Sequence, residues 1–115
     1  MTEAVAESAV GKLAELSADL LSAALVAADG TVLASTDEAP WSERTAQLWE
    51  AADSTSASTG SGSVNQLHIA ADAAEVFAVR EEGVTAIAVT DRFALESLMF
   101  CDLRAALREL SAGAS

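Results

Sequence analysis

The residues that could do chemistry in this chain are a single histidine, His68, a single cysteine, Cys101, and a few acidic side chains. A hydrolytic triad needs a serine, a histidine and an acid that converge, but His68 lies within an apolar, strand-like run without a catalytic motif around it. One histidine and one cysteine also do not supply the ligands of a usual zinc site. The sequence therefore predicts no catalytic residues and no metal site.

The acidic residues that could act as functional groups are better explained as solvated surface charge. Asp102 borders the apolar face of a helix-like pattern, where acids are usually solvated, and Glu81 and Glu82 stand beside Gly83 as surface charge at a turn would. The segment Gly60-Ser61-Gly62 is no phosphate loop, because it lacks both a lysine and a following helix start. We therefore expect no cofactor-binding residues and no enzyme activity on a small molecule.

Composition narrows the class of protein. The chain has 115 residues, 51% of them hydrophobic, which predicts one domain over residues 1–115 with one core. Eighteen acidic residues against six basic ones give a formal charge of −12, which argues against binding to nucleic acid or to an anionic membrane. A lone cysteine, no recognisable signal peptide and no apolar run near the ~20 residues of a membrane span predict a cytoplasmic protein.

The most strongly patterned stretch of the chain is 84–110. Val84–Thr90 is a continuous run of β-branched and small apolar residues, which predicts a buried strand at the centre of a sheet. Asp91 could then cap a long amphipathic helix. The apolar side chains that should pack on the sheet recur at three- and four-residue steps: Leu95, Met99, Leu103, Ala106 and Leu110.

The first part of the chain predicts a helix and a hairpin. Apolar residues at helical spacing indicate an amphipathic helix over Thr2–Ser17. Two strand-like runs follow, Leu20–Ala28 and Thr31–Thr36, and the Asp29-Gly30 pair between them is a strong signal for a two-residue hairpin turn.

A second helix is predicted over Trp41–Asp53, with Pro40 just before its first turn. Trp41, Leu48 and Ala52 fall near one face, which would face the core, whereas Trp49 lies roughly 100° round from Leu48. Two interpretations follow for Trp49. It either forms a second apolar face that invites a partner, or it packs inside the monomer.

The rest of the chain predicts further strands after a linker. Ser54–Ser63 is nearly all serine, threonine and glycine, which favours a flexible connection. The strand-like runs Val64–Ala70 and Glu75–Arg80 then lead through a glycine turn into Val84–Thr90. Because the connections are of hairpin length, we expect an α+β fold with a five-stranded antiparallel sheet flanked by helices, in the order α-β-β-α-β-β-β-α.

Several phrases of the sequence, in this order, resemble the roadblock/dynein light chain family, including its bacterial members that partner small Ras-like GTPases. The phrases are Leu25–Ser35 with its Asp-Gly turn, Val76–Arg80, Ala86–Arg92 and the amphipathic last helix. The resemblance covers nearly the whole chain and implies a roadblock/profilin-like fold. One departure is Ala94–Ser97, where many members have an asparagine-leucine-glycine phrase.

The resemblance also implies a homodimer in which the third strand and second helix pair with those of a twin. Carried over by position, the expected dimer interface is Trp41, Thr45, Leu48, Trp49, Val64, Gln66, Leu67 and His68. The residues themselves agree with this, because Val64–Ala70 has no charged side chain to deter pairing at a sheet edge unless His68 is protonated.

The leading functional hypothesis is a non-enzymatic homodimeric interaction module that binds and regulates a small Ras-like GTPase, as an activating or scaffolding partner. No arginine finger can be assigned from the sequence. Two alternatives stay open: a purely structural dimeric scaffold protein, and a small-molecule sensor domain. A sensor would need a sizeable internal pocket, whereas the alanine-rich composition predicts close packing.

Overall fold

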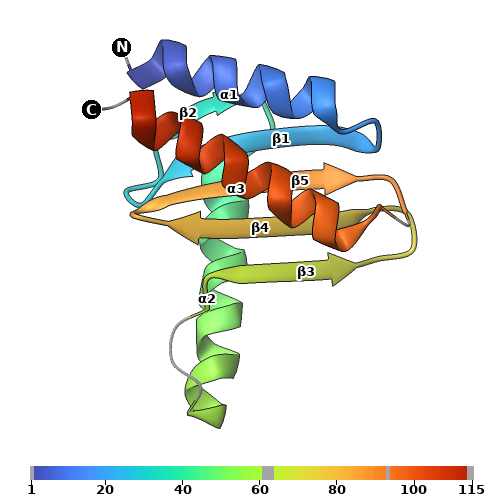
Figure 1. The fold of residues 1–115 in the computed structure, drawn as a ribbon. Coiled ribbons are helices and arrows are strands. Elements are labelled where there is room, and N and C mark those ends of the chain that lie inside the picture. Colours follow the sequence, from blue (N-terminus) through green and yellow to red (C-terminus); the bar gives the residue numbers. More distant parts are fainter. Residues whose placement is uncertain (1, 61–63, 93, 114–115) are drawn as a thin grey trace.

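The computed structural model describes residues 2–60, 64–92 and 94–113, and its strands form one antiparallel sheet (Figure 1). The sheet order is β2-β1-β5-β4-β3. The predicted fold class and element order are confirmed. The elements are α1 (Thr2–Leu16), β1 (Leu20–Ala27), β2 (Val32–Ser35), α2 (Trp41–Thr59), β3 (Gln66–Ala70), β4 (Glu75–Glu81), β5 (Val84–Thr90) and α3 (Glu96–Gly113).

The two faces of the sheet are covered unequally. Helices α1 and α3 lie side by side on one face, whereas α2 alone crosses the other and extends past β3 (Figure 1). Leu25, Phe77 and Leu103 belong to the core on the first face, and Trp41 and Trp49 belong to the core on the second. Because β1, β4 and β5 are covered on both faces, their sequences are continuous apolar runs instead of alternating ones.

The hairpin between β1 and β2 is confirmed, although four residues, 28–31, separate the strands instead of two. The Asp29 carboxylate accepts a hydrogen bond from the Thr31 backbone N–H at 2.9 Å. Gly30 has a φ of 93°, in the left-handed region that favours glycine. This short acidic-glycine phrase therefore fixes the turn through local chemistry alone.

Helix α2 is longer than predicted. The helix continues to Thr59 and Gly60 ends it, so the prediction of a flexible connection is wrong for residues 54–59. The last residues of the predicted connection, 61–63, lie outside the described part of the chain. The Thr55 hydroxyl donates to the carbonyl of Ala51 at 3.0 Å, and the Ser58 hydroxyl donates to that of Thr55 at 2.8 Å. These bonds satisfy the hydroxyls locally, although serine and threonine are not strong helix formers.

Helix α3 begins at Glu96, so the prediction that Asp91 caps it is wrong. The Asp91 N–H instead donates to the carbonyl of Asp19, which joins the end of β5 to the start of β1. Met99, Leu103, Ala106 and Leu110 are buried as predicted, but Leu95 precedes the helix and is 64% exposed. Among the helices of the described residues, none has the length and apolarity that crossing a membrane requires.

Candidate interaction surface

The sheet has two outer strands, and they are protected differently. The outer strand β2 has only four residues, and α1 packs against it. At the other side, β3 pairs with β4, and within the described residues no strand lies beyond it. Unpaired N–H and C=O groups at such an edge can pair with a strand from another chain.

The backbone of β3 shows which groups are available. The Arg80 N–H donates to the carbonyl of Asn65 at 2.9 Å, one residue before β3 begins. Bonded and non-bonded residue pairs alternate in an antiparallel ladder. The backbone groups of Gln66, His68 and Ala70 therefore point outward, away from β4, and a second strand could bond to them.

The His68 side chain is held within its own chain. Its ring stacks on Phe77 with 4.2 Å between centroids. Its Nε2 lies 2.5 Å from Glu75 Oε1, and its Nδ1 lies 2.5 Å from Glu96 Oε2. The histidine therefore fixes the position of β3 against β4 and α3 while its backbone stays open at the edge.

An aliphatic groove lies along one flank of α2, beside this open edge. We call it the apolar groove; its volume is about 440 Å³. Leu48 and the sheet residues Val76 and Val89 are only half-buried there. Val76 is paired in register with Ile69 of β3, which is 43% exposed, so aliphatic surface continues to the sheet edge. The groove is lined by Trp41, Arg44, Gln47, Leu48, Ala51, Val76, Ile87 and Val89.

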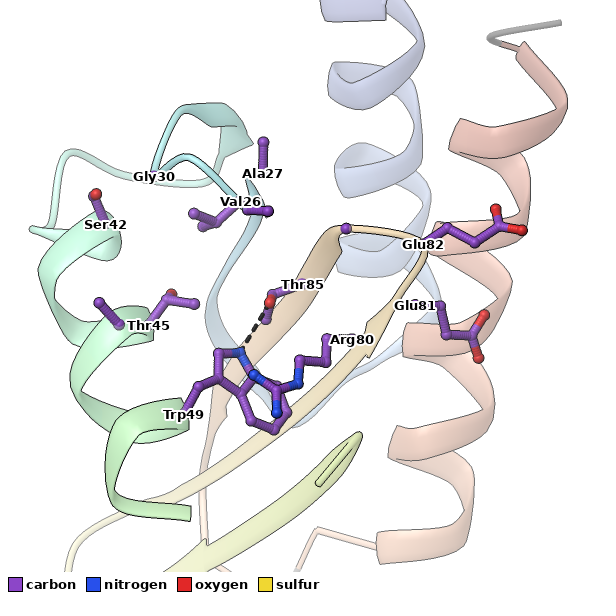
Figure 2. Close-up of a pocket in the computed structure, with 13 residues that line it drawn as sticks. Val26, Ala27, Gly30, Ser42, Thr45, Trp49, Arg80, Glu81, Glu82 and Thr85 are labelled. Atoms are coloured by element: carbon purple, nitrogen blue, oxygen red, sulfur yellow. Dashed lines mark hydrogen bonds between the residues drawn. The ribbon is translucent and has the colours of Figure 1, made fainter. Parts of the chain in front are cut away.

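A second cavity lies along the opposite flank of α2 (Figure 2). This cavity, which we call the polar pocket, has a volume of about 290 Å³ and lies between the first half of α2, the β1–β2 turn and the β4–β5 turn. The Trp49 Nε1–H donates to the Thr85 hydroxyl at 2.9 Å in its wall. The pocket is lined by Val26, Ala27, Ala28, Gly30, Ser42, Thr45, Ala46, Trp49, Arg80, Glu81, Glu82, Gly83 and Thr85.

Arg80 connects α2 to the start of β3. Its guanidinium lies over the Trp49 ring, 4.2 Å from the centroid, and donates to Asp53 at 2.6 Å. Its Nε–H donates to the carbonyl of Val64 at 2.7 Å. The hydrogen bond from Arg80 is the main cause of a lowered pKa of the Asp53 carboxyl. Sequence reasoning missed Arg80, although a lone arginine in an apolar strand was a visible signal.

The residues predicted for a dimer interface fall into two groups. Trp41, Thr45 and Trp49 form the buried stripe of α2, with 1%, 5% and 7% of their surface exposed. The structure therefore shows the interpretation in which Trp49 packs inside the monomer, and Trp49 is not on an outward face. Leu48 lines the apolar groove, and Val64, Gln66, Leu67 and His68 lie at or just before β3.

The described residues bring no candidate metal ligands together. Over 2–60, 64–92 and 94–113, no group of three or more His, Cys, Asp or Glu side chains could hold a metal ion. Cys101 is exposed on α3, and Asp102 beside it is half-buried, which raises the pKa of its carboxyl. The arrangement around α2 and β3 offers surfaces for binding.

Comparison with known proteins identifies the fold. No protein-family model matches the sequence, and no curated protein matches it either. Among solved structures, the Roadblock/LC7 domain from Streptomyces avermitilis superposes with a TM-score of 0.73, at 18% identity over 92% of this chain and 94% of that one. Myxococcus xanthus MglB gives a TM-score of 0.79, at 14% identity over 96% of this chain and 87% of that one.

A more distant likeness extends to the profilins. Acanthamoeba castellanii profilin IA matches with a TM-score of 0.59, at 18% identity over 93% of this chain and 98% of that one. The chain therefore has the roadblock/LC7 fold, which is related in architecture to that of profilin.

Proposed function

We propose that this chain is a non-enzymatic homodimeric interaction module that binds and regulates a small Ras-like GTPase. The observation that carries the proposal is the open edge of β3, continuous with the apolar groove beside α2. A twofold dimer uses the same patch on both copies. Antiparallel pairing of β3 with its twin meets that requirement, extends one sheet across both subunits and covers the aliphatic surface next to the edge.

The GTPase partner follows from the fold and the resemblance in sequence. The chain shares its fold with MglB and with a Roadblock/LC7 domain, and one matching structure is described as MglB with a tetrameric arrangement. Bacterial members of the family that the sequence resembles partner small Ras-like GTPases. Because no arginine finger is assigned, we expect any stimulation of hydrolysis to come from ordering the GTPase's own switch loops. The expected compartment is the cytoplasm.

The dimer is tested by light scattering of the purified protein across dilution. The double variant Gln66→Pro/Ala70→Pro removes two outward-pointing N–H donors from β3 without touching the bonds to β4. We expect a dimeric wild type and a monomeric variant with an unchanged circular dichroism spectrum. Val32→Lys on β2, at the opposite edge, is the matched control and should stay dimeric. A monomeric wild type at high concentration would refute the homodimer.

The partner is tested separately. Each small Ras-like GTPase of the source organism is loaded with GDP or with a non-hydrolysable GTP analogue and titrated with the dimer, and its hydrolysis rate is measured. We expect binding that depends on the nucleotide state. A dimer that binds none of them in either state would leave the purely structural scaffold as the function.

A further inference from the structure

We propose that one end of the α1–α3 helix pair docks a helix of another protein whose apolar stripe is flanked by lysine or arginine. The docking residues, which we call the leucine surface, are Leu16, Leu95 and Leu98, with 66%, 64% and 51% of their surface exposed. The helix pair lies across the sheet from α2 (Figure 1). The inference therefore depends neither on dimerisation through β3 nor on a GTPase partner.

The antiparallel packing of α1 and α3 brings the three leucines together. The Ser17 hydroxyl, one residue after Leu16, donates to the sulfur of Met99, one residue after Leu98, at 3.2 Å. The Met99 N–H donates to the Leu95 carbonyl at 3.0 Å, so the chain at Leu95 already follows the helical path. Side chains three residues apart on such a path are neighbours. Leu95 therefore lies beside Leu98, where α1 ends and α3 begins (Figure 1).

The outer seam between these two helices differs along its length. Farther from the leucines, Lys12 of α1 bridges the seam to Glu109 of α3, with 2.8 Å between Nζ and Oε1. Leu16 follows Lys12 by four residues, and Leu98 precedes Glu109 by eleven, so both leucines lie on the same line of the helix pair. The seam is thus bridged by charge at one place and is exposed and apolar at the other.

Exposed leucines that lie together indicate an interaction site. Single apolar side chains are common on protein surfaces, but clustered ones with a polar rim mark surfaces that bind a partner. Among the described residues, six large apolar side chains are exposed, and four of them lie at this end: the leucine surface and Leu21 at the start of β1. Covering these side chains removes apolar area from water, which is favourable.

The charges around the leucine surface determine which partner fits. Residues 15–21 and 90–102 form this end of the molecule, and their one basic side chain is Arg92. A second copy of the chain would bring a like-charged rim, and an anionic membrane would be repelled in the same way. A helix with lysines or arginines beside its apolar stripe complements the rim. The acidic side chains of the rim are Glu15, Asp19, Asp91, Glu96 and Asp102.

Asp102 provides a specific contact for such a cation. It follows Leu98 by four residues and precedes Glu109 by seven, so it lies on the side of α3 that meets α1. The Asp102 carboxyl is half-buried, and this desolvation raises its pKa without an offsetting cation among the described residues. A lysine of the docked helix supplies that cation and stabilises the carboxylate.

The experiment measures the binding of labelled peptides by fluorescence anisotropy. The probe has about 18 residues, only leucine and lysine, with the leucines spaced so that they form one stripe of a helix. A second peptide has the same composition in scrambled order, which controls for simple attraction to a chain of net charge −12. A third has glutamate in place of each lysine. We expect the probe to bind saturably and the other two peptides to bind at least about tenfold more weakly.

Variants place the probe on the leucine surface. Leu95→Ser/Leu98→Ser removes two exposed side chains and should weaken binding at least about tenfold. Serine is favoured just before a helix, so the start of α3 is kept. Val32→Ser removes an exposed apolar side chain from β2 and is the matched control, which should bind like the wild type. Asp102→Asn should weaken binding about two- to fivefold.

The outcomes separate this surface from the proposed dimer interface. The monomeric β3 variant should bind the probe like the wild type. No saturable binding by the wild type, equal binding of the scrambled peptide, or equal binding by Leu95→Ser/Leu98→Ser would overturn the proposal. A lower solution mass of Leu95→Ser/Leu98→Ser in light scattering would also overturn it, because a second copy of the chain would then be the occupant.

Discussion

The two flanks of α2 carry opposite chemistry although one helix forms both. The apolar groove presents Leu48 and Ala51 to valines of β4 and β5. The polar pocket presents Ser42 and Thr45, with Thr85 and Arg80 across from them. Trp49 separates the two, since it is buried on the stripe between them.

This difference distinguishes two kinds of binding. An aliphatic surface gains free energy simply by being covered, so it suits a permanent partner such as a second copy of the chain. A pocket suits an occupant that matches its shape and its few polar groups and that can come and go. The helix thus has the surface that we propose for dimerisation on one flank and the polar pocket on the other.

The largest effect should come from removing the residue that separates the flanks. Trp49→Ala deletes a buried indole and should lower the free energy of unfolding by about 3–5 kcal/mol in urea titrations followed by circular dichroism. Trp49→Phe keeps most of the ring but loses the bond to Thr85, and should cost about 1–2 kcal/mol. A cost below about 1 kcal/mol for Trp49→Ala would show that the indole does not hold the flanks apart.

The next test compares a charge on each flank. Leu48→Glu places a carboxylate in the apolar groove and should raise the dimer dissociation constant about 30-fold, measured by sedimentation. Ala46→Glu, two positions away on the polar flank, should leave dimerisation unchanged. Equal loss of dimer in both variants would mean that the helix pairs through its polar flank or that the variants act on folding.

A pair of threonines on the polar flank should respond in opposite directions. Thr45→Val removes an unpaired buried hydroxyl and should raise the free energy of unfolding by about 1 kcal/mol. Thr85→Val leaves the Trp49 N–H without its acceptor and should lower it by about 1–3 kcal/mol. Melting temperatures should therefore shift apart, by roughly 3–6 °C for each kcal/mol. A loss of stability in Thr45→Val would mean that its hydroxyl has a partner in solution.

The smallest effect should be electrostatic. Arg80 lowers the pKa of Asp53 from its usual 3.8, so the folded state favours the carboxylate. The stabilisation is complete above that usual value and is lost as the pH falls through the lowered pKa. Asp53→Asn should thus be less stable than the wild type near neutral pH and equal to it in strong acid. Added salt should shrink the difference, because both side chains are partly exposed. A difference that is independent of pH would contradict this origin.

Local sequence signals predicted the sheet and the hairpin. Val84–Thr90 forms β5 with the predicted bounds, because a continuous β-branched run is stable only where both faces are covered. The Asp29-Gly30 phrase makes a turn wherever it stands between two strands, since its carboxylate and its positive φ act within a few residues.

The incorrect predictions concern the length and the orientation of α2, which depend on contacts with residues distant in sequence. The serine- and threonine-rich composition of residues 54–59 predicts a linker, but these residues continue α2, and Arg80 of β4 donates a hydrogen bond to Asp53 just before this stretch. The prediction that the face of α2 with Leu48 packs on the sheet is wrong, because the buried face carries Thr45 and Trp49. The local sequence does not determine whether a leucine or the tryptophan next to it on a helix faces the core.

The sequence by itself therefore determined the elements, their order and the antiparallel sheet, because hydrophobic period, turn residues and connection lengths act over short distances. Only the tertiary structure decided which side of α2 faces the sheet, because Thr85 and Arg80 hold the Trp49 indole from strands 31 or more residues away in sequence. That rotation of one helix placed Leu48 in the apolar groove and buried Thr45 and Trp49 against the sheet.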